Sequence, residues 1–109
     1  MQLSILDGNN VTQTILAKGL EAIRNASGTI VATGVSQTLI PANPLRSGWF
    51  LQNCSQNDMV VNDVGEATIE AGGFIISPGG IFPPSTFPVT PNVIKITGTQ
   101  GDAFSVREF

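Results

Sequence analysis

From Gly28 onwards, short apolar runs alternate with clusters of Gly, Pro, Asn and Asp, a pattern that is typical of an all-β protein. In two of the runs, around Ile94 and around Phe104, large apolar side chains occupy every second position, so each predicted strand has one apolar and one mixed face. Seven such runs fit an antiparallel β-sandwich, jelly-roll-like, with two packed sheets. The predicted strands are residues 29–33, 36–40, 48–53, 59–62, 74–77, 92–97 and 103–109.

Three connecting segments have compositions that bear on topology. Residues 53–58 and residues 98–102 are short, polar and rich in turn residues, so we expect each to join the strands beside it into a β-hairpin. Residues 77–88 contain repeated prolines, which cannot donate to a sheet and exclude a central strand. This stretch is therefore predicted to be a long loop or an edge. Its Phe82 and Phe87 form either a lid on the core, the favoured interpretation, or a contact with another chain.

The first part of the chain follows a different pattern and divides it into an N-terminal arm, residues 1–27, and a sandwich domain, residues 28–109. Apolar side chains in residues 14–24 recur at helical spacing, which favours a short helix, although Gly19 weakens it. The alternative is an extended arm that becomes ordered only against a neighbour. The arm residues predicted to make such contacts are Leu3, Ile5, Leu6, Ile15, Leu16, Leu20 and Ile23.

The predicted strand at residues 48–53 carries large apolar groups on both faces. Alternation places Phe50 on one face and Trp49 with Leu51 on the other. The second apolar face is covered either by the Pro-rich loop or the N-terminal segment, or by a neighbouring subunit. Trp49, together with Phe82 and Phe87, is therefore a predicted interface residue, and we expect a cyclic homo-oligomer, a trimer.

Composition argues against an enzyme. The chain has no histidine or tyrosine, a single cysteine, and only thirteen charged side chains, 12% of its residues against about 25% in a typical soluble domain. General acid–base catalysis would therefore lack the side chain that titrates nearest to neutrality. We expect no catalytic residues and no cofactor, whereas sparse charge suits a permanent protein interface.

Other ligand classes find little support in the sequence. The densest acidic stretch, Asp58 to Glu70, lacks the alternating loop pattern of a calcium site, so no metal is expected. The net charge of −3 and the scattered Lys and Arg residues disfavour nucleic acid and anionic membranes. No segment has the roughly 20 apolar residues that a membrane span needs, and the N-terminus carries no signal pattern, so synthesis in the cytoplasm is expected.

The order of residues 28–34, 36–53, 61–65, 78–80 and 107–109 resembles small virion proteins of tailed bacteriophages. These are β-sandwich proteins that serve as capsid cement or decoration subunits, or that lie at the head–tail region. The resemblance implies a non-enzymatic subunit on the capsid surface of the virion, made in the host cytoplasm, whose partner is the major capsid protein. It covers about three quarters of the chain and carries no catalytic signature.

Two other hypotheses remain open at this point. The chain could be a carbohydrate- or receptor-binding module of a phage tail or fibre, in which exposed Trp49 and Phe87 stack on sugar rings. A cellular adhesin subunit is the third. Binding to glycans would separate the second hypothesis from the first.

Overall fold

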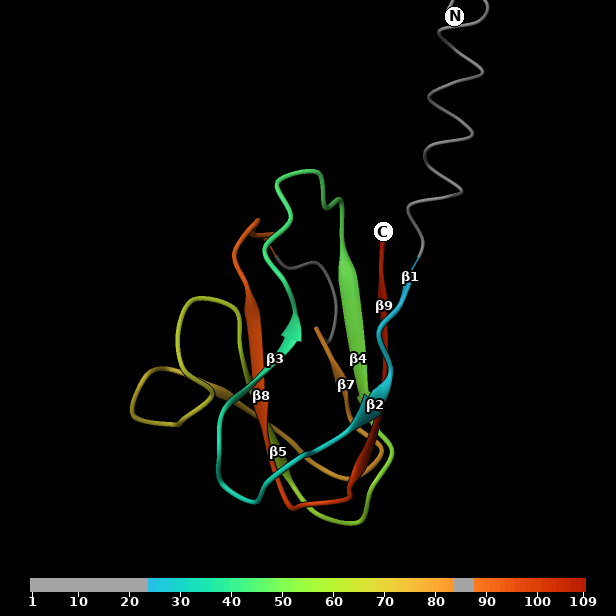
Figure 1. Ribbon diagram of the computed structural model, residues 1–109, viewed down its shortest axis with the longest axis vertical. Helices are drawn as coiled ribbons and strands as arrows, with labels where there is room; N and C mark the ends of the chain where they lie inside the picture. Colours follow the sequence, from blue (N-terminus) through green and yellow to red (C-terminus); the bar gives the residue numbers. More distant parts are fainter. Residues whose placement is uncertain (1–23, 84–87) are drawn as a thin grey trace, which may run out of the picture.

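The computed structural model describes residues 24–83 and 88–109, and the described chain is built from β-strands without helices (Figure 1). All strand pairs are antiparallel and lie in two facing sheets, which confirms the predicted all-β sandwich. The strands are β1 (Arg24–Asn25), β2 (Gly28–Thr29), β3 (Gln37–Ile40), β4 (Trp49–Asn53), β5 (Met59–Asn62), β6 (Phe74–Ile76), β7 (Ile81–Phe82), β8 (Ile94–Thr97) and β9 (Ala103–Glu108).

Sheet I has the order β1/β2-β9-β4-β7, and sheet II has the order β3-β8-β5-β6. The strands β1 and β2 pair with opposite halves of β9 and share one edge position. Between them, the Ala26 amide still donates to the Val106 carbonyl, at 3.1 Å. When β1 and β2 are counted as one strand, the strands occupy eight positions in two four-stranded layers. Their order is that of a jelly roll.

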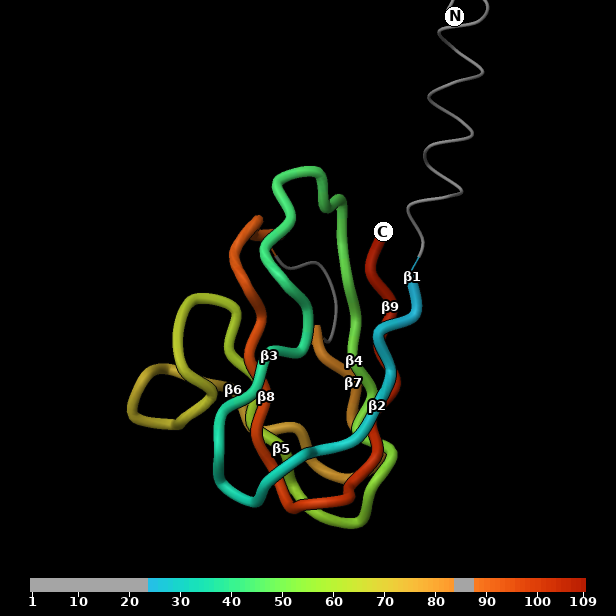
Figure 2. The backbone as a smooth tube through the Cα atoms, viewed as in Figure 1, coloured from blue at the N-terminus to red at the C-terminus, as the bar shows by residue number. Residues whose placement is uncertain are grey.

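The chain passes from one sheet to the other at almost every connection (Figure 2). The hairpins predicted at residues 53–58 and residues 98–102 are therefore wrong. Strand β4 lies in sheet I and β5 in sheet II, and β8 and β9 are divided in the same way. Instead of bonding to each other, β4 and β9 pair along their length with Leu51 opposite Val106, while β8 lies between β3 and β5. Among strands that follow each other along the chain, β5 and β6 are direct neighbours in one sheet.

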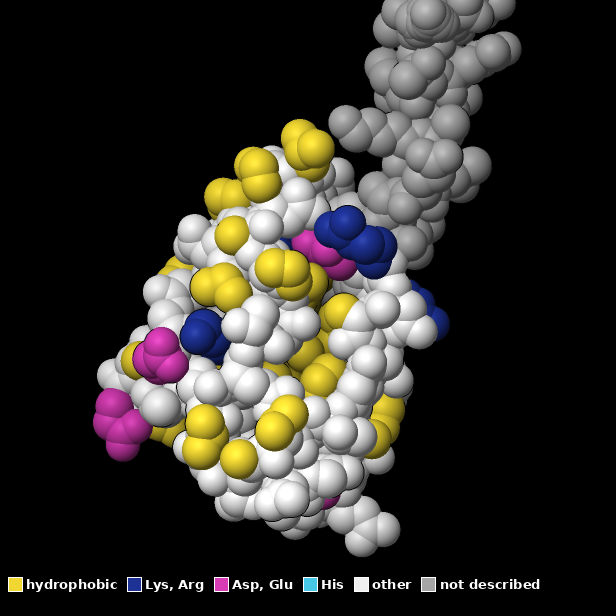
Figure 3. Space-filling model, in the orientation of Figure 1, with side chains coloured by type: hydrophobic (Ala, Val, Ile, Leu, Met, Phe, Trp, Pro, Cys, Tyr) yellow, Lys and Arg dark blue, Asp and Glu magenta, His cyan; other side chains and the backbone are white. Residues whose placement is uncertain are grey.

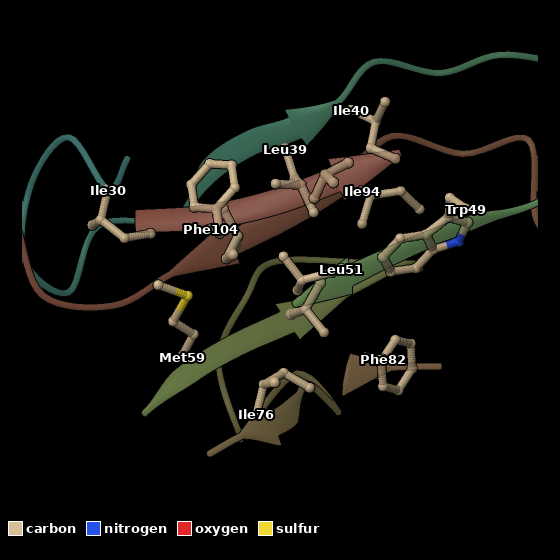
Figure 4. Packing of buried hydrophobic residues seen from close by; sticks show 13 residues of the cluster. Ile30, Leu39, Ile40, Trp49, Leu51, Met59, Ile76, Phe82, Ile94 and Phe104 are labelled. Carbon is tan, nitrogen blue, oxygen red and sulfur yellow. The ribbon is translucent and has the colours of Figure 1, made fainter. Parts of the chain in front are cut away.

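The core fills the space between the sheets (Figure 4). Along β4 the burial alternates, with Trp49 and Leu51 inward and Phe50 outward, as the sequence pattern predicts. The Trp49 and Phe82 rings lie with their centroids 5.6 Å apart, so Phe82 belongs to the core and confirms the lid interpretation for this residue. The buried apolar cluster consists of Ile30, Leu39, Ile40, Trp49, Leu51, Met59, Val61, Ile76, Phe82, Ile94, Ile96, Phe104 and Val106.

Several boundaries differ from the expected ones. Sheet I begins at Arg24, so the predicted division at residue 28 cuts off β1. The strand predicted at residues 29–33 ends at Thr29, because the chain then turns towards sheet II. The Pro-rich stretch contributes the two-residue strand β7 at the edge of sheet I. At an edge, the neighbouring prolines interrupt no hydrogen bonds between strands. The predicted helix at residues 14–24 lies outside the described residues except for Arg24, which is in β1.

Residues 63–73 fold over the outer side of sheet II. Ala67, within this segment, is fully buried, and its amide donates to the Ser36 hydroxyl at 3.0 Å. The buried Asn62 side chain donates to the carbonyls of Glu66 and Ala71, which holds both ends of the segment. At Gly73 a Cβ would lie 2.6 Å from a Val60 methyl group, so the backbone itself packs on the sheet. The segment therefore covers part of the outer side of sheet II, where Ile75, opposite Val60, remains 59% exposed.

Candidate protein-binding surface

The residues predicted to form an interface are divided by the structure into two groups. Trp49 and Phe82 are each 5% exposed and pack in the core. This burial corrects their assignment to an interface, because their side chains have almost no surface to offer a second chain. The other predicted residues, Leu3, Ile5, Leu6, Ile15, Leu16, Leu20, Ile23 and Phe87, lie outside the described residues.

The outer face of sheet I carries large apolar side chains that were not among the predicted interface residues, although alternation had separated Phe50 from Trp49. We define this face by the outward positions of β4, β7 and β9 and of their flanking residues. Phe50 is 44% exposed, Ile81 55% and Phe109 42%. The register places Phe50 opposite Arg107, and Gln52 between Ser105 and Ile81. Phe109 follows the alternation of β9, in which every second side chain lies on the outer side of sheet I. The sequence indicates this position, because Phe109 is two residues after Arg107.

Phe109 is fixed at the end of this face by the backbone. Its amide donates to the Gly48 carbonyl at 2.9 Å, and its carbonyl accepts from the amides of Ser47 and Gly48. A Cβ on Gly48 would lie 2.7 Å from the Phe109 ring, so the ring rests directly on the glycine backbone. Among the described residues, the outer face of sheet I thus presents apolar and uncharged polar groups, with Arg107 as its charged side chain.

An ionic cluster lies at the same end of the sandwich, where the described chain begins (Figure 3). The Glu108 carboxylate accepts from Arg24 Nη2 at 2.6 Å, Arg46 Nε at 2.8 Å and Asn43 Nδ2 at 3.1 Å. Burial raises the pKa of Glu108, but the hydrogen bonds from Arg24, Arg46 and Asn43 outweigh it and hold the pKa below its ordinary value of 4.5. These hydrogen bonds therefore stabilise the ionised form of the Glu108 carboxylate.

The remaining reactive groups do not converge on one point. Among the described residues, no group of three His, Cys, Asp or Glu side chains is placed to hold a metal ion. Glu66 lies 3.9 Å from Lys95, while Asp58 and Glu70 are exposed elsewhere. Cys54 is exposed beside the Ser105 hydroxyl, 3.4 Å away, at the far end of the outer face of sheet I.

A depression of about 430 Å³ lies between Pro91, residues 64–66 and β8. The charged groups that line it are Glu66 and Lys95, which already face each other. It contains no aromatic side chain and no buried polar group without a partner, so it offers little to orient a small ligand.

No protein-family model, no curated protein and no solved structure matches the chain. Within residues 24–83 and 88–109, no helix is of the length and apolar character that crossing a membrane would require.

Proposed function

We propose that this protein is a non-enzymatic structural subunit that attaches to an assembled protein shell, namely a capsid cement or decoration subunit of a tailed bacteriophage. The observation that supports it best is the outer face of sheet I. This face exposes Phe50, Ile81 and Phe109 around uncharged polar groups and has a single charge, Arg107. Depletion of charge around large apolar side chains is the mark of an interface core.

The N-terminal segment, residues 1–23, is also unusually apolar in composition. It holds eight large aliphatic residues and three charged ones, Asp7, Lys18 and Glu21. The segment joins the sandwich at Arg24, beside the ionic cluster. A rigid sandwich with an apolar segment attached to it is equipped to make extensive contacts with other protein chains.

A cement subunit requires no chemistry, because it acts by binding. A protein that binds the assembled shell and not its separated parts stabilises the shell by about 2.7 kcal/mol per site at a free concentration of 100 Kd. The partner in this proposal is the major capsid protein, and the subunit would be located on the capsid surface as a homo-oligomer, a trimer.

The carbohydrate-binding alternative loses its main support. Jelly rolls occur in both capsid and lectin domains, so the fold does not decide between them. The sugar-stacking hypothesis relied on an exposed Trp49, and this ring is buried against Phe82. The exposed described rings, those of Phe50, Phe74 and Phe109, belong to residues without a polar atom for a sugar hydroxyl.

The test is co-sedimentation of the full chain with shells assembled from the major capsid protein, followed by thermal disruption of the shells. We expect saturable binding and a higher disruption temperature. Unassembled capsid protein is the matched control and should not bind, because the proposed site exists only in the assembled shell. Failure to bind shells together with selective binding on a glycan array would overturn the proposal in favour of a receptor-binding module.

A further inference from the structure

We infer that the outer face of sheet I receives the N-terminal segment, residues 1–23, of a second copy of this chain, so that the subunits join head to tail in a closed ring. This inference names a partner of the described surface. It rests on the proposed function in treating this face as a protein contact, and it assigns that contact to the neighbouring subunit, so the ring would bind a shell through its other surfaces. Sedimentation of the isolated protein tests it separately from shell binding.

The two outer sides of the sandwich differ in how much of each is covered by other segments of the described chain. Residues 63–73 fold over sheet II, with Ala67 buried and Gly73 packed on Val60. Nothing comparable in the described chain lies over the outer face of sheet I, where Phe50, Ile81 and Phe109 remain between 42% and 55% exposed. Sheet II leaves Ile75 59% exposed opposite Val60, but sheet I exposes three large apolar side chains, so a further segment would cover more apolar surface on sheet I.

The position of Arg24 makes the chain's own segment a poor occupant. Strand β1 is antiparallel to β9 and begins with Arg24 opposite Glu108, so residues 1–23 join the sandwich at the end of sheet I and not over its outer face. Residues 20–23 contain no Gly, Pro, Asn or Asp that would turn the chain back over its own face. Twenty-three residues can span up to about 75 Å when extended, which is enough to reach a neighbouring sandwich.

The chemistry of the segment matches the face. The face presents apolar rings and uncharged amides and hydroxyls, with Arg107 as its charge. The segment presents alternating apolar residues such as Leu3 and Ile5, and its two carboxylates, Asp7 and Glu21, exceed its one lysine. Apolar burial together with a carboxylate near Arg107 would therefore satisfy both surfaces.

The contact joins two different surfaces, the segment of one copy and the face of the next. Such a heterologous contact produces a ring when its rotation closes, and a trimer is the ring that we expect. Every subunit in the ring would then both donate a segment and receive one.

The first experiment measures association of the full chain by sedimentation equilibrium. We expect the double variant Phe50→Ser/Ile81→Ser to raise the dissociation constant by more than about tenfold. The matched control is Ile69→Ser, because Ile69 is 52% exposed on the segment that covers sheet II, close to the 55% of Ile81. A monomeric unmodified protein, or equal effects of the double variant and the control, would overturn the inference.

The second experiment uses Cys54, whose thiol is exposed at the outer face of sheet I. One chain carries Leu16→Cys or Leu20→Cys with Cys54→Ser, and it is mixed with the unmodified chain under mild oxidation. We expect a disulfide between the two different chains, since one supplies only the segment and the other only the face. If a chain with both cysteines instead forms an internal disulfide while the mixture forms none, the segment covers its own sandwich and the inference is wrong.

Discussion

Arg46 and Glu108 form an ion pair that is hidden at one end of the sandwich. The distance between Arg46 Nε and Glu108 Oε2 is 2.8 Å, and the two side chains are 0% and 2% exposed. Arg46 also donates to the carbonyls of Pro41, Thr90 and Asn92. A single guanidinium therefore fastens the β3–β4 and β7–β8 crossings to the last strand, next to the point where the N-terminal segment joins the sandwich.

We predict that Arg46→Met will lower the free energy of unfolding by about 3–5 kcal/mol, because it removes the buried cation beside Glu108 and also leaves three backbone carbonyls without their donor. Chemical denaturation at neutral pH measures the change. Lys95→Met is the control, because the Lys95–Glu66 pair, at 3.9 Å, involves a largely exposed Glu66 and should contribute less than about 1 kcal/mol. Similar losses for the two variants would show that the buried pair does not hold this end together.

The low pKa of Glu108 predicts a dependence of stability on pH. The folded-state pKa lies below the unfolded value, so near pH 4.5 the unfolded chain binds more protons than the folded one. The stabilisation is therefore present at neutral pH and is lost as the pH falls through 4.5 and below. We expect Glu108→Gln to be less stable than the unmodified protein at pH 7, with the two stabilities converging as the pH falls.

Denaturation curves between pH 3 and pH 7 would test this expectation. Glu70→Gln removes an exposed carboxylate and serves as the control, and we expect it to lower the stability at pH 7 less than Glu108→Gln does. A constant difference between Glu108→Gln and the unmodified protein across the range would contradict a role for the charged form of Glu108.

The sequence was a good guide to where strands occur and a poor guide to how they pair. The strand at residues 59–62 was predicted with its observed bounds, because apolar runs and the turn residues beside them are local signals. The hairpins were mispredicted because a short polar segment can either reverse the chain within one sheet or carry it across to the other. Alternation reveals that a strand has an apolar face, not which neighbour it bonds to.

The candidate surface was only partly predictable for a related reason. Alternation separated Phe50 from Trp49 but could not say which of two large apolar faces the core would take, and the core took Trp49. The ionic cluster has no local signature at all, because Arg46 and Glu108 are 62 positions apart in the chain and meet only after both sheets have formed.

Asn53 shows what distinguishes a crossing from a hairpin, and it provides the last prediction. Its buried side-chain amide donates to the Asn57 carbonyl at 2.7 Å and to the Ile76 carbonyl at 2.8 Å, and its oxygen accepts from the Ser55 amide and hydroxyl. Because Ile76 lies in sheet II, this side chain ties the end of β4 to the opposite sheet. The Asn-x-Ser triplet at this position therefore has a structural role.

We expect Asn53→Ala to lower the free energy of unfolding by about 2–4 kcal/mol, because each buried polar group left without a partner costs about 1–3 kcal/mol. Asn57→Ala is the matched control in the same turn. Its amide bonds to Asp102 at the surface, and its backbone carbonyl, which Asn53 uses, is retained, so the loss should stay within about 1 kcal/mol. Thermal and chemical denaturation of both variants would measure the difference, and equal losses would mean that the turn is held by its backbone and not by the buried amide.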